Sequence, residues 1–205
     1  SDKLIISKFK NKFIIGMVAN ISWEKGFDDF VRVVSQVNTR VKDCQFVVIG
    51  KIFDNQKNYY KKIKLLSKTL KVDNIIFIGK KDDVRPLLNR FDIYLCTSKY
   101  ESSPISVWEA MSMGKPILTT DVGDVSLYVK NNVNGYVAKN NIIQDLSKRL
   151  IYLKSNRHVC NKFGKNSRAI AKSHLDLSFS ADKHMVAYMS AYVKSKKKWK
   201  KNNYV

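Results

Sequence analysis

The sequence has few cysteines, prolines and acidic residues, and it contains no long apolar run. Three cysteines and three prolines occur in 205 residues, and 17 acidic side chains stand against 38 basic ones. A helix that crosses a membrane needs about 20 consecutive, mostly apolar residues, and no run approaches that length. No signal-peptide pattern opens the chain, which begins at Ser1. With 44% hydrophobic residues, we expect a globular domain with an ordinary core, and we expect it to be part of a longer protein.

The cysteines argue against both a disulfide framework and a metal site. They are far apart and odd in number, and Cys44 and Cys96 lie in or beside apolar runs. We interpret them as buried, reduced thiols of a cytoplasmic protein. The chain has no CxxC and no HExxH pattern, and its three histidines share no metal-ligand spacing. We therefore expect no metal and no cofactor.

The net charge of +21 is the most unusual feature of the composition. It favours anionic partners such as phosphates, nucleic acid or a lipid surface. The alternative is that the lysines, which make up 31 of the 38 basic residues, only cover solvated helix faces. Six lysines surround Trp199 between Lys194 and Lys201, after a possible amphipathic helix over 181–192. This segment is either a basic patch for an anionic membrane surface or a solvated tail.

Short apolar runs alternate with segments of helical period, which indicates β-α-β units and a parallel sheet. The runs are near-continuously apolar, as expected for strands covered on both faces. We predict an α/β fold: a doubly wound, parallel, six-stranded, Rossmann-like sheet with C-terminal helices. The expected strands are 13–19, 45–49, 75–78, 93–96, 116–120 and 135–138. The expected helices are 27–39, 59–70, 84–89, 104–113, 142–154, 157–172 and 179–194.

Ligands of such sheets collect at the carboxyl ends of the strands, so the loops that follow the strands are the candidate site. The stretch from Ser98 to Met113 is the most informative of them, because it carries Glu101 in a loop and Glu109 inside the following helix. Ser103 fits the N-cap and Pro104 the first helical position. Free N–H groups at a helix start bind phosphate, and carboxylates accept hydrogen bonds from hydroxyls. We therefore expect an anionic, hydroxyl-rich ligand.

Several segments together resemble the C-terminal, donor-binding domain of a family 4 retaining glycosyltransferase of the GT-B fold. The segment ESSPISVWEAMSMGKPILTTDVG resembles the E-x7-E block of that family and the strand and glycine turn after it. GMVANISWEKG resembles the first strand and its Lys-Gly loop, and NNVNGYV resembles a later turn. The resemblance runs in order from about Phe13 to Tyr192. It implies a linker over 1–12 from an absent N-terminal domain, a nucleotide-sugar-binding domain over 13–178, and a C-terminal helix and basic tail over 179–205.

The resemblance also implies roles for individual residues. Lys25 would contact the donor diphosphate as a point charge. Glu101 would face the transferred sugar, and Glu109 would accept hydrogen bonds from the ribose. The candidate catalytic residues are thus Glu101 and Lys25. The candidate donor-binding residues are Asn20, Lys25, Gly50, Ile78, Gly79, Lys80, Ser98, Glu101, Ser102, Ser103, Ile105 and Glu109.

Some positions depart from the family pattern. Ala19-Asn20 stands where the family usually has Gly-Arg, which removes a bidentate cation from the phosphate site. We expect Lys25 to supply more of the positive charge at the phosphate site, or Lys51, Lys80 or Lys81 to take the place of the missing arginine. Ser102 and Asp124 each stand where a glycine is common. We expect both Trp23 and Trp108 to be packing residues.

The implied activity is transfer of a sugar, with retention, from a UDP-sugar or GDP-sugar to a hydroxyl acceptor. The expected setting is surface polysaccharide or glycolipid synthesis, with a lipid-linked acceptor at the cytoplasmic face of a membrane and no nucleic acid. We expect this chain alone to bind the donor without normal turnover. Two alternatives stay open: a nucleotide-sugar sensor that has lost the chemistry, motivated by Asn20, and a basic nucleic-acid-binding domain, motivated by the charge.

Overall fold

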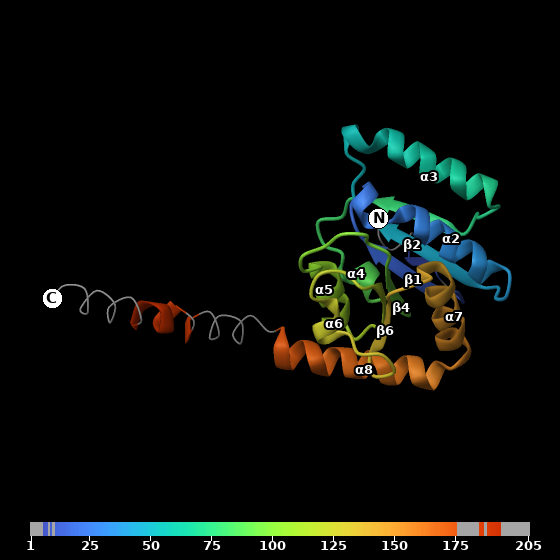
Figure 1. Cartoon of the computed structure of the whole chain (residues 1–205). Coiled ribbons are helices and arrows are strands. Elements are labelled where there is room, and N and C mark those ends of the chain that lie inside the picture. Colours follow the sequence, from blue (N-terminus) through green and yellow to red (C-terminus); the bar gives the residue numbers. More distant parts are fainter. Residues whose placement is uncertain (1–5, 8, 10, 176–184, 187, 194–205) are drawn as a thin grey trace.

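Six parallel strands form a single sheet in the order β3-β2-β1-β4-β5-β6 (Figure 1). The computed structural model describes residues 6–7, 9, 11–175, 185–186 and 188–193. The reversal of strand order between β1 and β4 is the switch point of a doubly wound fold, and it opens a crevice at the carboxyl ends of these two strands. The strands are β1 Phe13–Val18, β2 Cys44–Ile49, β3 Ile75–Gly79, β4 Ile93–Cys96, β5 Ile117–Thr120 and β6 Gly135–Ala138.

The central strands are largely apolar because helices cover both faces of the sheet. Every residue of β4 and β5 is buried, whereas β3, at the sheet edge, is half-buried throughout. The helices are α2 Phe27–Asn38, α3 Lys57–Thr69, α4 Arg85–Leu88, α5 Ile105–Ser112, α6 Val125–Tyr128, α7 Ile142–Ser155 and α8 Arg157–His174. Two short 3-10 turns, η1 Trp23–Lys25 and η2 Asp54–Gln56, follow β1 and β2.

The core consists of two apolar clusters, one on each face of the sheet. One face packs against α2, α3 and α7, through side chains such as Phe30, Val34, Ile63 and Leu150. The other packs against α4, α5 and the end of α8. Alternate residues of β1 divide between the faces, since Ile15 joins the first cluster and Ile14 the second. Helices therefore cover both faces of the sheet, and the edge at the carboxyl ends of the strands is where a ligand site can form.

The predicted fold is confirmed, and most predicted elements are correct to within two residues. The strands at 93–96 and 135–138 have the predicted bounds. Helix α6 and both 3-10 turns were not predicted from the sequence. The predicted cap of the helix at 104–113 is wrong: Pro104 is the N-cap residue of α5, and Ser103 lies outside the helix. The side chain of Ser103 is bonded elsewhere, as described below.

The predicted thiols are buried and free: Cys44, Cys96 and Cys160 are all inaccessible, and none forms a disulfide. Phe9, within the predicted linker, is buried against the face that α8 covers. At the other end, residues 185–186 and 188–193 are helical and exposed. The remainder of the predicted helix over 179–194 and the lysine cluster from Lys194 to Lys201 lie outside the described residues. Among the helices that the structure describes, none is both long and apolar enough to cross a membrane.

Candidate functional site

A polar cavity of about 380 Å³ lies at the carboxyl edge of the sheet, where β1 and β2 end and α5 begins. It is lined by the ends of both strands, by the loops after them and by the first turn of α5. The lining residues are Val18, Ala19, Asn20, Lys25, Ile49, Gly50, Lys80, Lys81, Val84, Glu101, Ser103, Pro104, Ile105 and Ser106. Seven of the twelve candidate donor-binding residues are therefore brought together here, although they come from four separate loops.

The position of Lys25 depends on a close contact between two loops. Gly26 adopts a left-handed conformation with φ of 63°, and a Cβ on it would lie 1.9 Å from the carbonyl oxygen of Thr97. Only glycine combines that conformation with that approach. The Thr97 hydroxyl donates a hydrogen bond to the Lys25 carbonyl at 3.3 Å, and the Lys99 N–H donates to the Glu24 carbonyl at 2.7 Å. The Lys25 loop is thus fastened to the segment that follows β4.

Lys25 and Glu101 form an ion pair at the wall of the cavity. The Nζ of Lys25 lies 2.6 Å from Oε1 of Glu101, and the side chains are 29% and 15% exposed. The Ser98 hydroxyl donates to the same oxygen at 2.9 Å. Within the described part of the chain, no hydrogen bond is recorded for the second oxygen, Oε2. Glu101 is therefore held in place through one oxygen while the other can accept a bond from a ligand hydroxyl.

Asn20 and Gly50 join the ends of β1 and β2. Oδ1 of Asn20 accepts a hydrogen bond from the Lys51 N–H at 2.8 Å. A Cβ on Gly50 would lie 1.9 Å from the carbonyl oxygen of Ala19, so glycine is required for this approach. Asn20 holds the neighbouring loop by this bond and adds no charge to the cavity.

The first turn of α5 contributes backbone donors to the cavity. The first recorded donor in this helix is the Val107 N–H, which bonds the Pro104 carbonyl at 2.9 Å. The N–H groups of Ile105 and Ser106 precede it and belong to residues that line the cavity. No side chain caps the helix. Such free N–H groups, at the positive end of the helix dipole, are suited to an anion.

Ser103 has a different role from the predicted one. Its hydroxyl accepts a hydrogen bond from Nε1 of Trp108 and donates one to Asp124, both at 3.0 Å. The prediction that Trp108 is a packing residue agrees with this contact and with its edge-on packing against Tyr128. Trp23 differs: it is 51% exposed and stacks against Tyr100, with ring centroids 5.5 Å apart.

The other predicted residues lie around the cavity or apart from it. Ser98 holds Glu101, and the Gly79 carbonyl accepts the Gly50 N–H at 3.0 Å. Ile78 packs into the core face and does not line the cavity. Glu109 is exposed on α5 and also does not line it. It lies four residues after Ile105, on the same side of the helix, so it continues from the cavity rim.

Of the lysines considered as replacements for the missing arginine, two are at the cavity and one is not. Lys80 and Lys81 line it. Lys80 also pairs with Asp82 at 3.0 Å. The Nζ of Lys51 lies over the ring of Phe53, 4.7 Å from its centroid, and Lys51 is absent from the cavity wall.

Sequence reasoning missed Tyr94, which is buried and bonds the backbone of Val18, a residue of the cavity wall. Its hydroxyl donates to the Val18 carbonyl at 3.2 Å and lies 3.3 Å from the Val18 N–H. Burial raises the pKa of this phenol, so it stays neutral. The run of apolar residues around Tyr94 predicted a buried strand but gave no sign that its hydroxyl reaches the end of the neighbouring strand.

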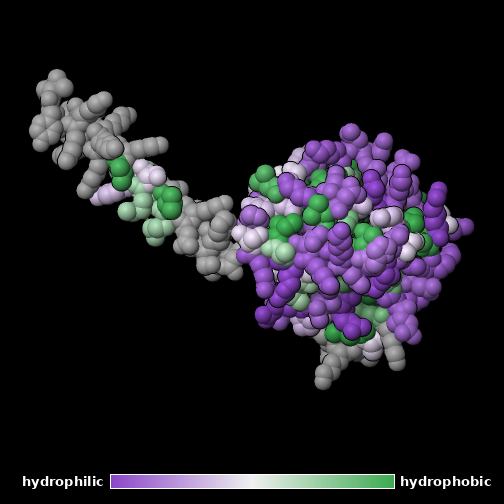
Figure 2. Space-filling model, turned by 90° about the horizontal axis from the view of Figure 1, so that it is seen from below, coloured by the Kyte–Doolittle hydropathy of each residue, from purple (hydrophilic) through white to green (hydrophobic). Residues whose placement is uncertain are grey.

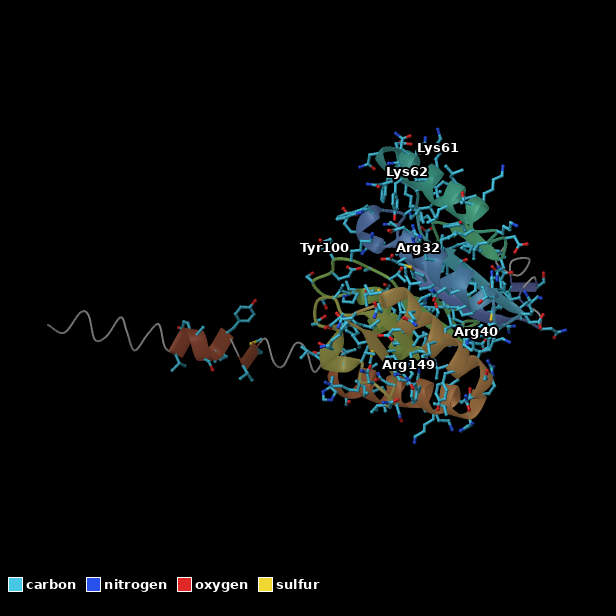
Figure 3. All side chains as sticks on the ribbon, turned by 45° about the vertical axis from the view of Figure 1, so that its right-hand side comes forward. Arg32, Arg40, Lys61, Lys62, Tyr100 and Arg149 are labelled. Atoms are coloured by element: carbon cyan, nitrogen blue, oxygen red, sulfur yellow. The ribbon has the colours of Figure 1, made fainter. Side chains whose placement is uncertain are left out.

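A second hollow of about 420 Å³ lies on the other side of Glu101. Its lining residues are Lys99, Tyr100, Glu101, Ser102, Asp121, Val122 and Gly123. Tyr100 is 65% exposed and projects from the carboxyl edge in Figure 3. Glu101 therefore lies between two hollows, with an exposed aromatic pair beside the second. Within the described residues, no group of three or more His, Cys, Asp or Glu side chains is arranged to hold a metal ion.

Comparison with known proteins places most of the chain in a single family. Residues 2–170 match the family described as glycosyl transferases group 1. The chain is 24% identical over 168 residues to UDP-Gal:alpha-D-GlcNAc-diphosphoundecaprenol alpha-1,3-galactosyltransferase of Escherichia coli, covering 80% of this chain and 42% of the relative. It is 25% identical over 177 residues to N,N'-diacetylbacillosaminyl-diphospho-undecaprenol alpha-1,3-N-acetylgalactosaminyltransferase of Campylobacter jejuni, covering 86% and 44%. The chain thus spans less than half the length of these two relatives.

The fold matches solved structures of the same architecture. The crystal structure of Anabaena HepE in complex with UDP and glucose superimposes with a TM-score of 0.83 and 20% identity, covering 93% of this chain and 52% of that one. At this level of identity the likeness supports the fold alone.

Proposed function

This chain belongs to the family of glycosyl transferases group 1, and from that premise we propose that it is the donor-binding domain of a retaining, family 4 type glycosyltransferase. It takes a nucleoside diphosphate sugar into the cavity at the carboxyl edge and presents the sugar to a hydroxyl acceptor. The observation that carries this proposal is the Lys25–Glu101 pair, which sets a cation and a half-occupied carboxylate beside the free N–H groups of α5.

Each part of the donor has a matching group in the cavity. The diphosphate would lie between Nζ of Lys25 and the N–H groups of Ile105 and Ser106, with Lys80 and Lys81 adding positive charge nearby. A sugar hydroxyl would donate to Oε2 of Glu101. The base would lie against the Gly50 and Gly79 backbones. The ribose would extend along α5 from Ile105 towards Glu109.

Catalysis would rest on positioning and on stabilisation of charge. As the bond between the sugar and the diphosphate breaks, negative charge grows on the departing phosphate and positive charge on the sugar ring. Lys25 and the start of α5 stabilise the first, and the Glu101 carboxylate stabilises the second. Donor binding would draw the Lys25 ammonium from Glu101 towards phosphate, which frees Glu101 for the sugar. These groups leave no need for a metal in the proposed step.

We propose UDP as the nucleotide, because the Escherichia coli relative is named for UDP-Gal and the HepE structure contains UDP. We propose a lipid-linked acceptor, because the names of both relatives contain an undecaprenol diphosphate. The setting would be surface glycan synthesis at the cytoplasmic side of a membrane. The lysine cluster from Lys194 to Lys201 would contact the anionic surface.

The experiment is a calorimetric titration of this chain with UDP, GDP, ADP and their sugars. We expect UDP and one UDP-sugar to bind, and Lys25→Gln to weaken both by about tenfold, the worth of one charge-assisted hydrogen bond. A failure of every nucleotide to bind, with the chain folded, would contradict the proposed donor site. Transfer is measured separately on the full-length protein, because we expect the 205 residues alone to bind without turnover. Donor binding without transfer in the full-length protein would favour a sensor.

A further inference from the structure

A separate cavity lies at the opposite, amino-terminal edge of the sheet, away from the two hollows beside Glu101. We propose that it binds a small phosphate-bearing anion. We call it the amino-end cavity. Its volume is about 650 Å³, and it lies where β1, β4 and β5 begin. Its lining residues are Phe9, Asn11, Lys12, Ile14, Asn89, Arg90, Phe91, Asp92, Gly114, Lys115, Pro116, Cys160, Asn161, Gly164, Lys165 and Arg168. None of these residues lines the candidate donor cavity.

Positively charged side chains outnumber negatively charged ones in this cavity. Among the described residues, five cationic side chains belong to the lining, and a single carboxylate, Asp92, accompanies them. That carboxylate is already bonded: Oδ2 accepts the Ile14 N–H at 2.7 Å, and Oδ1 accepts Arg157 at 2.9 Å. In the part of the chain that the structure describes, no ion pair is recorded for Arg90 or Lys165. Lys12 pairs at 3.4 Å with Asp43, which is not part of the lining. The cavity therefore carries excess positive charge that its own residues do not neutralise.

One helix face supplies a row of these groups. Asn161, Lys165 and Arg168 follow one another at spacings of four and three residues along α8, so they project on the same side. The helix is fixed against the turn before β5, because a Cβ on Gly164 would lie 2.3 Å from the Gly114 carbonyl oxygen. Figure 2 shows that the surface on the α8 side of the molecule is predominantly hydrophilic. The row is therefore rigidly placed and open to a polar ligand.

Two of the cations are held at defined points and keep further donors. Nζ of Lys115 donates to the Asn89 carbonyl at 2.7 Å, at the end of α4. A guanidinium nitrogen of Arg168 donates to the Ser112 carbonyl at 2.6 Å, at the end of α5. An ammonium has three N–H donors and a guanidinium five, so one bond each leaves most of them for a ligand. These contacts reduce the side-chain entropy that binding must overcome.

The surroundings of Lys115 agree with an anionic ligand. Burial lowers the pKa of its ammonium, and the Arg90 charge lowers it further, against an opposing effect of Asp92. A phosphate between these cations would offset their repulsion. The amides of Asn11, Asn89 and Asn161 add neutral donors and acceptors, which suit the hydroxyls of a phosphate ester. Because the site is a hollow, a small soluble anion fits it better than a lipid surface.

The test is a titration of this chain with inorganic phosphate, pyrophosphate and glycerol 3-phosphate at matched ionic strength. The cavity variant is Arg90→Gln with Lys165→Gln. The matched control is Lys61→Gln with Lys62→Gln, which removes the same charge from exposed positions on α3 (Figure 3), a helix that contributes no residue to the cavity. We expect the cavity variant to weaken glycerol 3-phosphate binding by about tenfold or more, because it removes two cations that can make charge-assisted contacts, and the control to leave it within about twofold.

Further measurements separate this cavity from the donor site and from a membrane. Lys25→Gln should leave glycerol 3-phosphate binding unchanged, and the cavity variant should leave UDP binding unchanged. Loss of glycerol 3-phosphate binding in Lys25→Gln, or equal losses in cavity and control variants, would overturn the proposal. Arg90→Lys with Lys165→Arg keeps both charges and should restore affinity, which excludes a folding defect. If the cavity variant affects only binding to phosphatidylglycerol vesicles, the soluble-anion proposal is wrong.

Discussion

Lys25 and Glu101 lie 76 positions apart in the sequence, yet their side chains meet at 2.6 Å at the carboxyl edge of the sheet. The contact depends on the switch in strand order, which sets the loop after β1 beside the loop after β4. Because both side chains are partly sheltered, removal of one partner leaves the other with an uncompensated charge in a polar cavity.

The two members of this pair should affect different parts of the donor. We expect Glu101→Gln to reduce affinity for a UDP-sugar by about tenfold and to change UDP affinity much less, because the sugar is what Glu101 would contact. Lys25→Gln should reduce affinity for both ligands. Calorimetric titration of each variant with UDP and with the UDP-sugar checks this. Equal losses for UDP in both variants would contradict the separate roles.

Gly26 should tolerate substitution less well than another glycine with positive φ. Gly26→Ala combines a left-handed residue with a contact of 1.9 Å to the Thr97 carbonyl, so we expect it to lower the free energy of unfolding by about 3 kcal/mol or more. Gly79→Ala is the matched control. Its φ is 87°, but a Cβ there meets nothing within 4 Å, and we expect a loss of about 1 kcal/mol. Urea unfolding of both variants measures the difference. Equal destabilisation would mean that the loop contact with Thr97 has no energetic role.

Glu109 should contribute to donor binding without contributing to the fold. It is exposed on α5, so we expect Glu109→Ala to change the free energy of unfolding by less than about 0.5 kcal/mol. Nucleotide affinity should fall by about tenfold, because the carboxylate would accept hydrogen bonds from the ribose. Asp54→Ala, at an exposed site on η2, is the control and should change neither quantity. Unchanged nucleotide affinity in Glu109→Ala would remove Glu109 from the site.

Stability should fall in alkaline solution because of the buried thiols. Burial raises the pKa of Cys44 from 9.0 to about 11, and that of Cys160 equally. Each thiol stays protonated in the folded chain while the unfolded chain loses its proton above pH 9. The stabilisation is therefore complete below pH 9 and is lost as pH rises towards 11.

Replacing one of these thiols should make the alkaline loss smaller. Each thiol accounts for up to about 2 kcal/mol across this interval. Urea unfolding of the wild type and of Cys44→Ala at pH 8 and pH 10.5 tests this, since the variant should lose less stability between the two. A parallel loss in both proteins would show that the Cys44 thiol does not titrate in this way.

The predictions that succeeded depend on local pattern. β4 and β6 have the predicted bounds because short apolar runs are flanked by polar or turn-forming residues. Alternation of strands and helices predicted the parallel sheet, and the parallel sheet predicted that the loops after the strands meet at one edge. The loops that carry Asn20, Lys25, Gly50 and Glu101 were identified in this way, the resemblance to the glycosyltransferase family singled out residues within them, and these four residues do line one cavity.

The predictions that failed or were missing depend on contacts between loops or on elements too short for a pattern. Serine is a residue type that favours the N-cap position, but the Ser103 hydroxyl bonds Trp108 and Asp124 instead. Tryptophan is a residue type that usually packs into a core, but Trp23 lies exposed against Tyr100. The short helix α6 has too few residues for a periodic pattern. For Ser103 and Trp23, Asp124 and Tyr100 from other loops decided the outcome.

The sequence by itself determined the class of fold, the order of its elements and the edge at which a site would form, because hydrophobic period and turn chemistry are local properties. Only the tertiary structure decided which side chains meet there. The pairing of Lys25 with Glu101, the hydrogen bond from Ser98 to the same oxygen, and the gathering of Arg90, Lys115 and Lys165 at the opposite edge all join residues from different elements. Such contacts follow from strand order and helix packing, which bring together chain segments that no local pattern relates.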